Sequence, residues 1–395
     1  MYYSKILNLQ VSFIVFLLFL LSGWQTQVLS QGTIIDHTCT DITIIPESAI
    51  IQAKAMLHIG YGHTSHGSQL TTGMTGLITF ANNGGLGLSH PQDIFSWNNG
   101  GVNSALDLEE GDGYGSGWLD HDCGYYPAWV NETREYLDDP SHADVNVIIW
   151  SWCGQASGRT EQEMIDTYLS PMSQLETDYP QVTFVYMTGH ADGSGETGNL
   201  HLRNQQIRNY CITNNKVLYD FYDIECYDPD GEYFGDKNVN DDCSYTGGNW
   251  AIEWQNSHIE GVDWYNCSAA HTQPLNANLK AYAAWWLWAS LAGWAPVTDV
   301  QNFQNINPTE FKLYQNYPNP FNPTTRINYS LPKAGKVELF VYNLLGQKLV
   351  ELVNSEKPAG HHTINFDASN LSSGVYFYSL QAGQFINVKK MILLE

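Results

Sequence analysis

The sequence predicts a parallel, three-layer α/β domain followed by a small all-β sandwich. Between residues 32 and 294, continuous apolar runs alternate with amphipathic stretches of helical period, which is typical of a parallel sheet covered by helices on both faces. After residue 300 the apolar runs are short and alternate in polarity, with turn residues between them, as in an antiparallel sandwich. Composition marks the boundary, because every cysteine and tryptophan precedes residue 300.

The hydrophobic period predicts the individual elements of the first domain. Helices are expected over residues 46–57, 162–178, 200–213 and 276–291, with Pro171 breaking the second because proline lacks an N–H. Apolar runs predict strands over residues 57–62, 145–150, 182–187 and 216–224. In a parallel sheet the active site lies at the carboxyl ends of the strands, so we expect chemistry in the loops that follow them.

Residues 1–30 are predicted to be a signal peptide. Lys5 precedes an apolar run over residues 11–21, and Val28 and Ser30 occupy the −3 and −1 positions before Gln31. The run is too short to span a hydrocarbon core of about 30 Å, although a membrane anchor is the alternative. No later stretch has the length to cross a bilayer, so we expect an exported protein with no transmembrane segment in the mature chain.

Composition and net charge indicate which kinds of molecule this protein binds. Lys and Arg number 17 against 41 Asp and Glu, and a net charge of −24 argues against nucleic-acid binding because phosphate backbones repel such a chain. Charged residues are 15% of the chain, while Trp and Tyr number 13 and 24. Few charges with many aromatic residues are common in extracellular proteins that meet carbohydrate.

The seven cysteines are expected to be mostly paired in an oxidising compartment, with at least one left free. Cys226 and Cys243 flank an acidic stretch, so a disulfide closing that loop is the first expectation. The acidic stretch includes Asp228, Asp230 and Asp241. Calcium prefers such oxygen ligands, so a calcium site is an alternative to a solvated acidic loop. No other cofactor is expected.

Six alternating runs are expected to form the strands of the sandwich, at residues 326–331, 336–344, 348–353, 362–368, 374–380 and 385–393. The segments YQNYPNPFNPTTRINYSLP and VYNLLGQ, with the stretch from NLSSGVYFYSL to KKMILLE, closely resemble the C-terminal sorting domain of the type IX secretion system. The resemblance implies contact with that secretion machinery and a secreted or surface-attached protein. The expected organisation is thus a signal peptide (1–30), an α/β domain (31–295), a linker (296–312) and a sorting domain (313–395).

The first strand runs into the motif H-x-S-x-G, which contains Ser65 and Gly67. A serine at a sharp turn from strand to helix exposes its hydroxyl beside free backbone N–H groups, as nucleophilic serines of α/β hydrolases do. We prefer Ser65 to Ser68, which lies three residues further on, and the alternative is a serine that only caps the helix.

His271 stands directly before the last predicted helix, and together with Ser65 and Gly67 it resembles the SGNH (GDSL-like) hydrolase superfamily, which has a flavodoxin-like fold. The resemblance implies that Ser65 attacks an acyl group and that His271 takes its proton. The family's acidic residue is replaced by serine here, so Asp263 or a carbonyl oxygen is expected to orient His271. The residues expected to furnish the oxyanion hole or to bind substrate are Gly67, Cys153, Gly154, Gln155 and His190.

Several imidazoles are expected at the same sheet edge, and they keep a metal alternative open. His63 and His66 follow the first strand, while His190 and Asp192 follow the strand over residues 182–187. Imidazole and carboxylate ligands suit a transition metal, although H-x-x-H on a turn lacks the helical i,i+4 spacing.

Three functions therefore remain open at the level of sequence. The first is a secreted serine esterase that removes acyl groups from an extracellular carbohydrate, the second a binding or surface protein without turnover, and the third a metal-dependent hydrolase. Trp250 and Trp254 either offer flat faces to sugar rings or simply pack.

Overall fold

The computed structural model describes residues 33–111, 118–295, 311–314, 316 and 319–394. The predicted signal peptide, and most of the predicted linker, lie outside these residues. A seven-stranded sheet has the order β1-β7-β6-β5-β2-β4-β3 with parallel pairing throughout, which confirms the parallel α/β domain. Its strands are β1 (Ile34–Ile35), β2 (His58–Gly62), β3 (Trp97–Asn98), β4 (Leu106–Glu110), β5 (Val147–Trp150), β6 (Thr183–Met187) and β7 (Val217–Tyr219).

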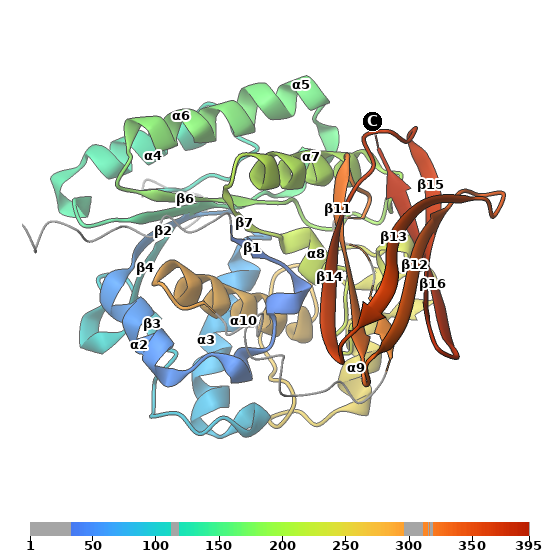
Figure 1. The fold of residues 1–395 in the computed structure, drawn as a ribbon. Helices are drawn as coiled ribbons and strands as arrows, with labels where there is room; N and C mark the ends of the chain where they lie inside the picture. The colour runs from blue at the N-terminus through green and yellow to red at the C-terminus, as the bar shows by residue number, and fades with distance from the viewer. Residues whose placement is uncertain (1–32, 112–117, 296–310, 315, 317–318, 395) are drawn as a thin grey trace, which may run out of the picture. The chain divides into compact units, whose positions relative to one another are not determined.

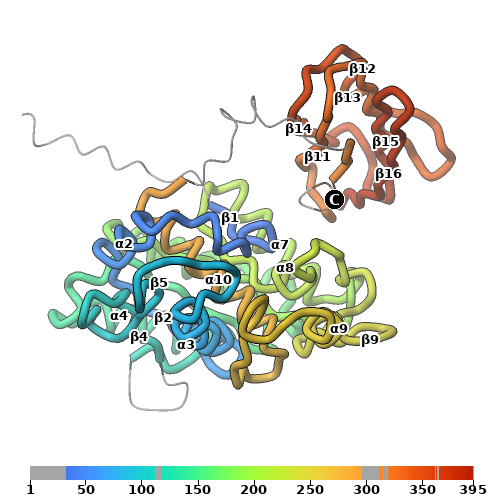
Figure 2. The backbone as a smooth tube through the Cα atoms, turned by 90° about the horizontal axis from the view of Figure 1, so that it is seen from below, coloured from blue at the N-terminus to red at the C-terminus, as the bar shows by residue number. Residues whose placement is uncertain are grey.

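Helices cover both faces of this sheet (Figure 1). One face carries α4 (Ala128–Asp138), α5 (Glu161–Met164), α6 (Ser170–Asp178) and α7 (Asn199–Thr213). The other face carries α2 (Glu47–Met56), α3 (Ser68–Asn82) and α10 (Pro274–Leu291). Helix α10 packs against both α2 and α3. Figure 2 views the domain from the face that these three helices cover. The three layers are those that the alternating pattern predicts.

The strand order locates the crevice of the domain. From β2 the chain forms β3 and then β4 on one side of β2, and it then crosses to β5 on the other side. Ligands of open α/β sheets bind outside the carboxyl ends of the strands at such a switch point. The loops that follow β2 and β5 are therefore the expected walls of a binding site.

Two of the predicted elements differ in the structure from their prediction. The helix over residues 162–178 is not broken at Pro171. A π-helical turn (Ile165–Leu169) between α5 and α6 changes the local hydrogen-bonding pattern, and it accommodates the absence of an N–H donor at Pro171. The strand predicted over residues 216–224 ends at Tyr219. The side chain of Asp220 accepts a hydrogen bond from Asp223 N and starts the short helix α8 (Phe221–Glu225) instead.

Helix α10 is a core helix rather than an amphipathic one. Every residue from Leu275 to Ala289 is buried, including Lys280. The helix also contacts α8 and α9 (Trp250–Ser257), so neighbours surround it. A helix that is buried all round is expected to be apolar all round, which makes the charge of Lys280 an exception that needs a partner.

The C-terminal part forms two antiparallel sheets, and all six predicted strands are present. One sheet has the order β10-β11-β14 and the other β13-β12-β15-β16. The strands are β10 (Lys312–Leu313), β11 (Thr324–Leu331), β12 (Gly335–Tyr342), β13 (Lys348–Lys357), β14 (Gly360–Asp367), β15 (Gly374–Ala382) and β16 (Phe385–Leu393). Inward residues such as Ile327, Leu339 and Tyr378 form a hydrophobic core that is separate from the core of the α/β domain.

The disulfide expected between Cys226 and Cys243 is wrong, because all seven cysteines, each within the described residues, are free thiols. Cys226 caps the C-terminus of α8, and Cys243 Sγ lies 3.6 Å from Thr272 Oγ1. Both thiols are fully buried and pack as small apolar side chains. Within the same residues, no helix combines the length and the apolar character that a bilayer span requires.

The absence of cross-links predicts that reductant does not change stability. A melting curve in excess dithiothreitol is expected to superimpose on the curve without it, because no covalent constraint on the unfolded chain is removed. A fall of several degrees in Tm on reduction would show that disulfides form in the mature protein.

Candidate functional site

Three loops at the carboxyl edge of the sheet bring the candidate residues together. His66 lies in the loop between β2 and α3, Cys153 follows β5, and His190 follows β6. Asp241 comes from the acidic stretch after α8. The loops meet at the switch point of the strand order, as the topology predicts.

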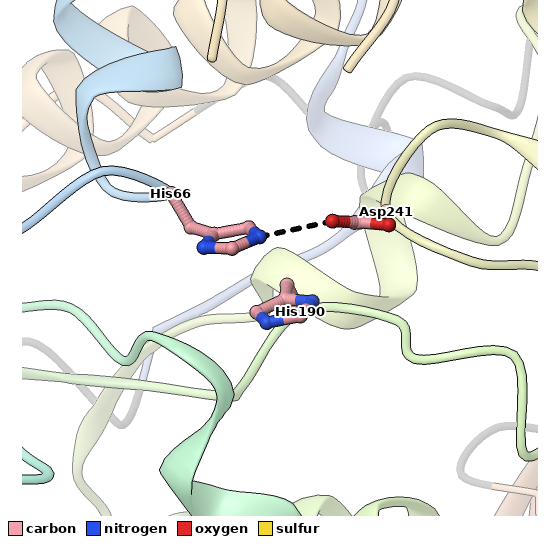
Figure 3. Close-up of side chains that lie close together, drawn as sticks. All are labelled: His66, His190 and Asp241. Atoms are coloured by element: carbon pink, nitrogen blue, oxygen red, sulfur yellow. Dashed lines mark hydrogen bonds and ion pairs between the residues drawn. The ribbon is translucent and has the colours of Figure 1, made fainter. Parts of the chain in front are cut away.

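Cys153, His66 and Asp241 form a continuous chain of hydrogen-bonded groups. Cys153 Sγ lies 3.0 Å from His66 Nδ1, and His66 Nε2 lies 3.0 Å from Asp241 Oδ2. Figure 3 shows the His66 ring pointing its Nε2 edge at the Asp241 carboxylate. His66 is buried, while Cys153 remains partly exposed. The order thiol, imidazole, carboxylate is that of a nucleophile, its base and the group that orients the base.

The environment favours the charged form of both reacting partners. Burial acts to raise the pKa of Cys153, but hydrogen bonds with His66 and Ser65 outweigh it and lower the pKa of this thiol to about 7. Burial acts to lower the pKa of His66, but hydrogen bonds with Asp241 and Cys153 raise it to about 9. A thiolate beside an imidazolium is therefore the favoured pair between about pH 7 and pH 9.

The two pKa values predict the pH dependence of thiol reactivity. Alkylation of Cys153 by iodoacetamide is expected to be half-maximal near pH 7 and to slow at lower pH, because protonation removes the thiolate. Burial raises the pKa of Cys243 to about 12 and that of Cys267 to about 11, so these thiols stay protonated at pH 7.5. Peptide mapping after brief alkylation at pH 7.5 should find Cys153 labelled alone. Labelling that starts only near pH 9 would contradict the pair.

Three parallel imidazoles lie at this site. The His190 ring stacks on His66 with centroids 3.8 Å apart and an interplanar angle of 3°, and the His271 ring stacks on His66 at 4.4 Å and 11°. Two rings do not fit side by side on one face of an imidazole at these separations, so His66 lies between the other two. Burial lowers the pKa of His190, and the charge of His66 adds to that effect.

The metal alternative is tested by the same ring geometry. His66, His190 and Asp241 each offer a ligand atom, and these atoms lie within 4.8 Å of one another. The Nε2 atom of His190 is buried without a hydrogen-bond partner. However, an imidazole lone pair lies in its ring plane, and one ion cannot lie in the planes of two rings stacked 3.8 Å apart. A shared ion would require one ring to turn, so the geometry favours the thiol arrangement over the metal site.

Ser65 and His271, the pair chosen from sequence, both lie at this site. Ser65 Oγ is 3.6 Å from Cys153 Sγ, whereas no hydrogen bond joins Ser65 to His271 among the described residues. His271 is exposed and has a left-handed backbone with φ of 61°, an uncommon conformation for a residue other than glycine. Asp263 accepts a hydrogen bond from Ile259 N in its own loop, and no described contact links it to His271.

The residues expected to form the oxyanion hole surround Cys153. Gly154 is exposed, and its backbone contributes to the lowered pKa of Cys153. Gln155 Nε2 donates to Asp122 Oδ2 at 3.3 Å. A Cβ atom at Gly67 would lie 2.4 Å from Ser151 Oγ, so glycine is required there for the close packing of the two loops.

The other polar residues singled out from sequence serve local structure. His63 Nε2 lies 3.0 Å from Glu110 Oε2, and Asp192 accepts a hydrogen bond from Ser194 N. The three aspartates of the calcium alternative are engaged separately. Asp228 accepts from Glu232 N, Asp230 accepts from Trp254 Nε1, and Asp241 faces His66.

The tryptophans considered as a wall for sugar rings pack instead. Trp250 is 1% exposed, and its Nε1 donates to Glu225 O. Trp254 stacks on the ring of His258 with centroids 3.5 Å apart.

A buried ion pair lies close to the imidazoles, since the charge of Glu225 acts on both His66 and His190. Lys280 Nζ is 2.6 Å from Glu225 Oε1, and both side chains are fully buried. Glu225 Oε2 also accepts a hydrogen bond from Ala191 N, next to His190. Gln69 accepts a hydrogen bond from Lys280 Nζ through its Oε1 atom. Its Nε2 atom donates a hydrogen bond to the carbonyl oxygen of Ala270, next to His271. The pair therefore anchors loops that carry the imidazoles.

Comparison with known proteins identifies the C-terminal part. Residues 315–394 match the family model of the secretion system C-terminal sorting domain, so the protein is secreted or attached to the cell surface. A solved structure of PorZ, described as an essential surface component of the type-IX secretion system of Porphyromonas gingivalis, is 14% identical and covers 22% of this chain and 11% of that chain, with a TM-score of 0.16. No curated protein matches the chain.

Two solved mannanase structures are also similar at a low level. An endo-β-1,4-mannanase of Thermotoga petrophila is 10% identical and covers 63% of this chain and 47% of that chain, with a TM-score of 0.18. An endo-β-1,4-mannanase double mutant of Cellulomonas fimi is 10% identical and covers 74% and 55%, with a TM-score of 0.19. The chain spans less than two thirds of the length of each of these solved structures. At such TM-scores the similarity carries no argument about activity.

Proposed function

We propose that the α/β domain is an acyl hydrolase in which Cys153 is the nucleophile, His66 the acid and base, and Asp241 the carboxylate that orients His66. The hydrogen-bonded order from Sγ to imidazole to carboxylate, with 3.0 Å at each step, carries this proposal. The lowered pKa of Cys153 supports it, because the thiolate is the nucleophilic form.

The acylation step follows from these positions. The Cys153 thiolate attacks the carbonyl carbon of an ester, so a C–S bond forms and negative charge develops on the carbonyl oxygen. The backbone N–H groups of the loop at Gly154 and Gln155 are proposed to stabilise that oxygen. The C–O bond then breaks, and the leaving alcohol takes the proton of His66 Nδ1.

The deacylation step returns the site to its starting state. His66, now neutral, takes a proton from a water molecule that attacks the thioester carbon, and the C–S bond breaks. The carboxylic acid leaves, while the thiolate and the imidazolium form again. Asp241 holds the imidazole in one orientation and stabilises its positive charge throughout.

An acylated extracellular carbohydrate is the proposed substrate. The sorting domain brings the protein to the cell exterior, where such polymers are found. The net charge of −24 disfavours polyanionic substrates, whereas a neutral glycan ester meets no such repulsion.

A serine esterase of the SGNH type is the second candidate. The observation that favours it is the position of Ser65 on the loop after β2, in contact with Cys153 and close to the imidazoles. In that mechanism Ser65 attacks and His271 takes its proton after the exposed ring turns toward the hydroxyl.

Class-selective inactivation distinguishes the two nucleophiles. Hydrolysis of a small aryl acetate is expected to be lost after treatment with iodoacetamide and to persist after treatment with a fluorophosphonate. The reverse pattern would support Ser65. Wild-type protein without turnover on any acyl ester would instead support a binding protein, and loss of activity with chelator alone would support the metal alternative.

A further inference from the structure

We propose that Tyr125 and Tyr126 form a stacking subsite for a neutral sugar ring of the substrate beside Cys153. The inference rests on the proposed function and deepens it by naming the residues that select a glycan ester over other esters.

Exposed aromatic rings are concentrated in one segment. Tyr125 and Tyr126 are 51% and 46% exposed, and among the described Phe, Tyr and Trp residues the only other exposed side chain is Trp118, at 36%. Trp118 packs edge-on against His142, with centroids 5.1 Å apart. Tyr125 likewise packs edge-on against His121, with centroids 5.1 Å apart, but both tyrosines keep about half of their surface exposed and offer more open aromatic surface than Trp118.

Hydrogen bonds attach this segment to the candidate site. Asp122 Oδ2 accepts from Thr64 Oγ1 at 2.6 Å, next to Ser65. Cys123 N donates to Ser151 O at 2.9 Å, two residues before Cys153. The two tyrosines therefore follow a stretch that is tied to both walls of the crevice.

Close packing at Gly124 places the tyrosines beside the nucleophile's own loop. A Cβ atom at Gly124 would lie 2.2 Å from Gln155 Cδ, so the backbone before Tyr125 is in direct contact with that loop. Arg159 also donates to Gly124 O at 2.7 Å. The backbone that precedes the two tyrosines is therefore held against the loop that follows Cys153.

A neutral sugar ring suits this surface better than other ligands. Each tyrosine combines an apolar ring face with a polar hydroxyl edge, and a pyranose likewise has C–H faces and a rim of hydroxyl groups. The net charge of −24 disfavours acidic polymers. A long acyl chain is the competing occupant, and it would bind the ring faces without using the hydroxyl edges.

The test compares the hydrolysis of an acetyl ester of a sugar with that of an acetyl ester of a small aromatic alcohol. The ratio of kcat/KM for an acetylated neutral oligosaccharide to kcat/KM for a small aryl acetate is expected to fall at least about tenfold in Tyr125→Ala/Tyr126→Ala, because stacking energy is lost with the sugar alone. Phenylalanine at both positions should restore most of the ratio. Ile252→Ala, which removes an exposed apolar side chain of α9, should leave the ratio unchanged. An unchanged ratio in the double alanine variant would overturn the proposal.

Binding without turnover separates this proposal from the proposed function. Calorimetric titration of Cys153→Ala with the same oligosaccharide lacking acetyl groups should show binding that weakens at least about tenfold when both tyrosines are replaced by alanine. Binding that is insensitive to the tyrosines, or that is seen with fatty acyl ligands instead, would overturn the subsite even if the hydrolase is active. Sugar binding that requires the tyrosines in a protein without turnover would support the subsite and refute the hydrolase.

Discussion

Replacing Cys153 with alanine is expected to lower kcat for a small aryl acetate by about four orders of magnitude or more. The substitution removes the atom that forms the covalent bond, and removal of a nucleophile from a nucleophile–base pair has effects of this size. Steady-state kinetics with the purified protein measure the loss. Cys153 is partly exposed and makes no contribution to a hydrophobic core, so the melting temperature should stay close to that of the wild type.

Ser65→Ala is the matched control for this variant. Its hydroxyl lies 3.6 Å from Cys153 Sγ and contributes to the lowered pKa of the thiol, so a loss of about tenfold or less is expected. A loss of several orders in Ser65→Ala, with near-normal activity in Cys153→Ala, would identify a serine esterase.

Lys280→Met is expected to lower the free energy of unfolding by about 3–5 kcal/mol, because it leaves the Glu225 carboxylate buried and unpaired. Urea denaturation measures the loss as a lower transition midpoint with an unchanged slope. The double variant Lys280→Met/Glu225→Gln should recover part of the stability, since it also removes the uncompensated charge.

Lys237→Met provides the surface control for the buried pair. Lys237 and Glu232 form an ion pair with side chains 35% and 60% exposed, and such pairs contribute about 0–1 kcal/mol. Equal effects of Lys237→Met and Lys280→Met would contradict the anchoring role assigned to the buried pair.

The fold can be predicted from sequence because the spacing of apolar residues along the chain shows which residues are buried. Residues 147–150 of β5 and 184–187 of β6 are buried on both faces and therefore read as unbroken apolar runs. The residue at which β7 ends cannot be predicted from this spacing. Its apolar run continues into α8, and only the cap made by Asp220 separates the two elements.

The sheet edge that carries the candidate site also follows from sequence, whereas the contacts between its residues do not. Ser65, Cys153 and His190 each follow a parallel strand, and the carboxyl ends of parallel strands lie at the same edge of a sheet. Sequence therefore predicts that these residues lie near one another. Asp241 lies 175 residues from His66, in an irregular loop whose path no periodic pattern reports. The partner of His66 therefore becomes visible only in three dimensions.

The cysteines show where a compartment argument fails. Export predicts disulfides, but Cys226 and Cys243 are buried as separate thiols. A count of cysteines carries no information about which of them lie in contact. Sequence position predicts that the partly exposed Cys153 furnishes the oxyanion hole or binds substrate, and the proposal that it is the nucleophile rests on its hydrogen bond with His66.

Trapping of the acyl-enzyme tests the central claim most directly. Wild-type protein mixed with an excess of aryl acetate is quenched in acid within the first turnovers, digested and mapped by mass spectrometry. We expect an acetyl group, bound as a thioester, on the peptide that contains Cys153, and none in Cys153→Ala. An acetyl group on the peptide that contains Ser65, or turnover without any acylated peptide, would contradict the account.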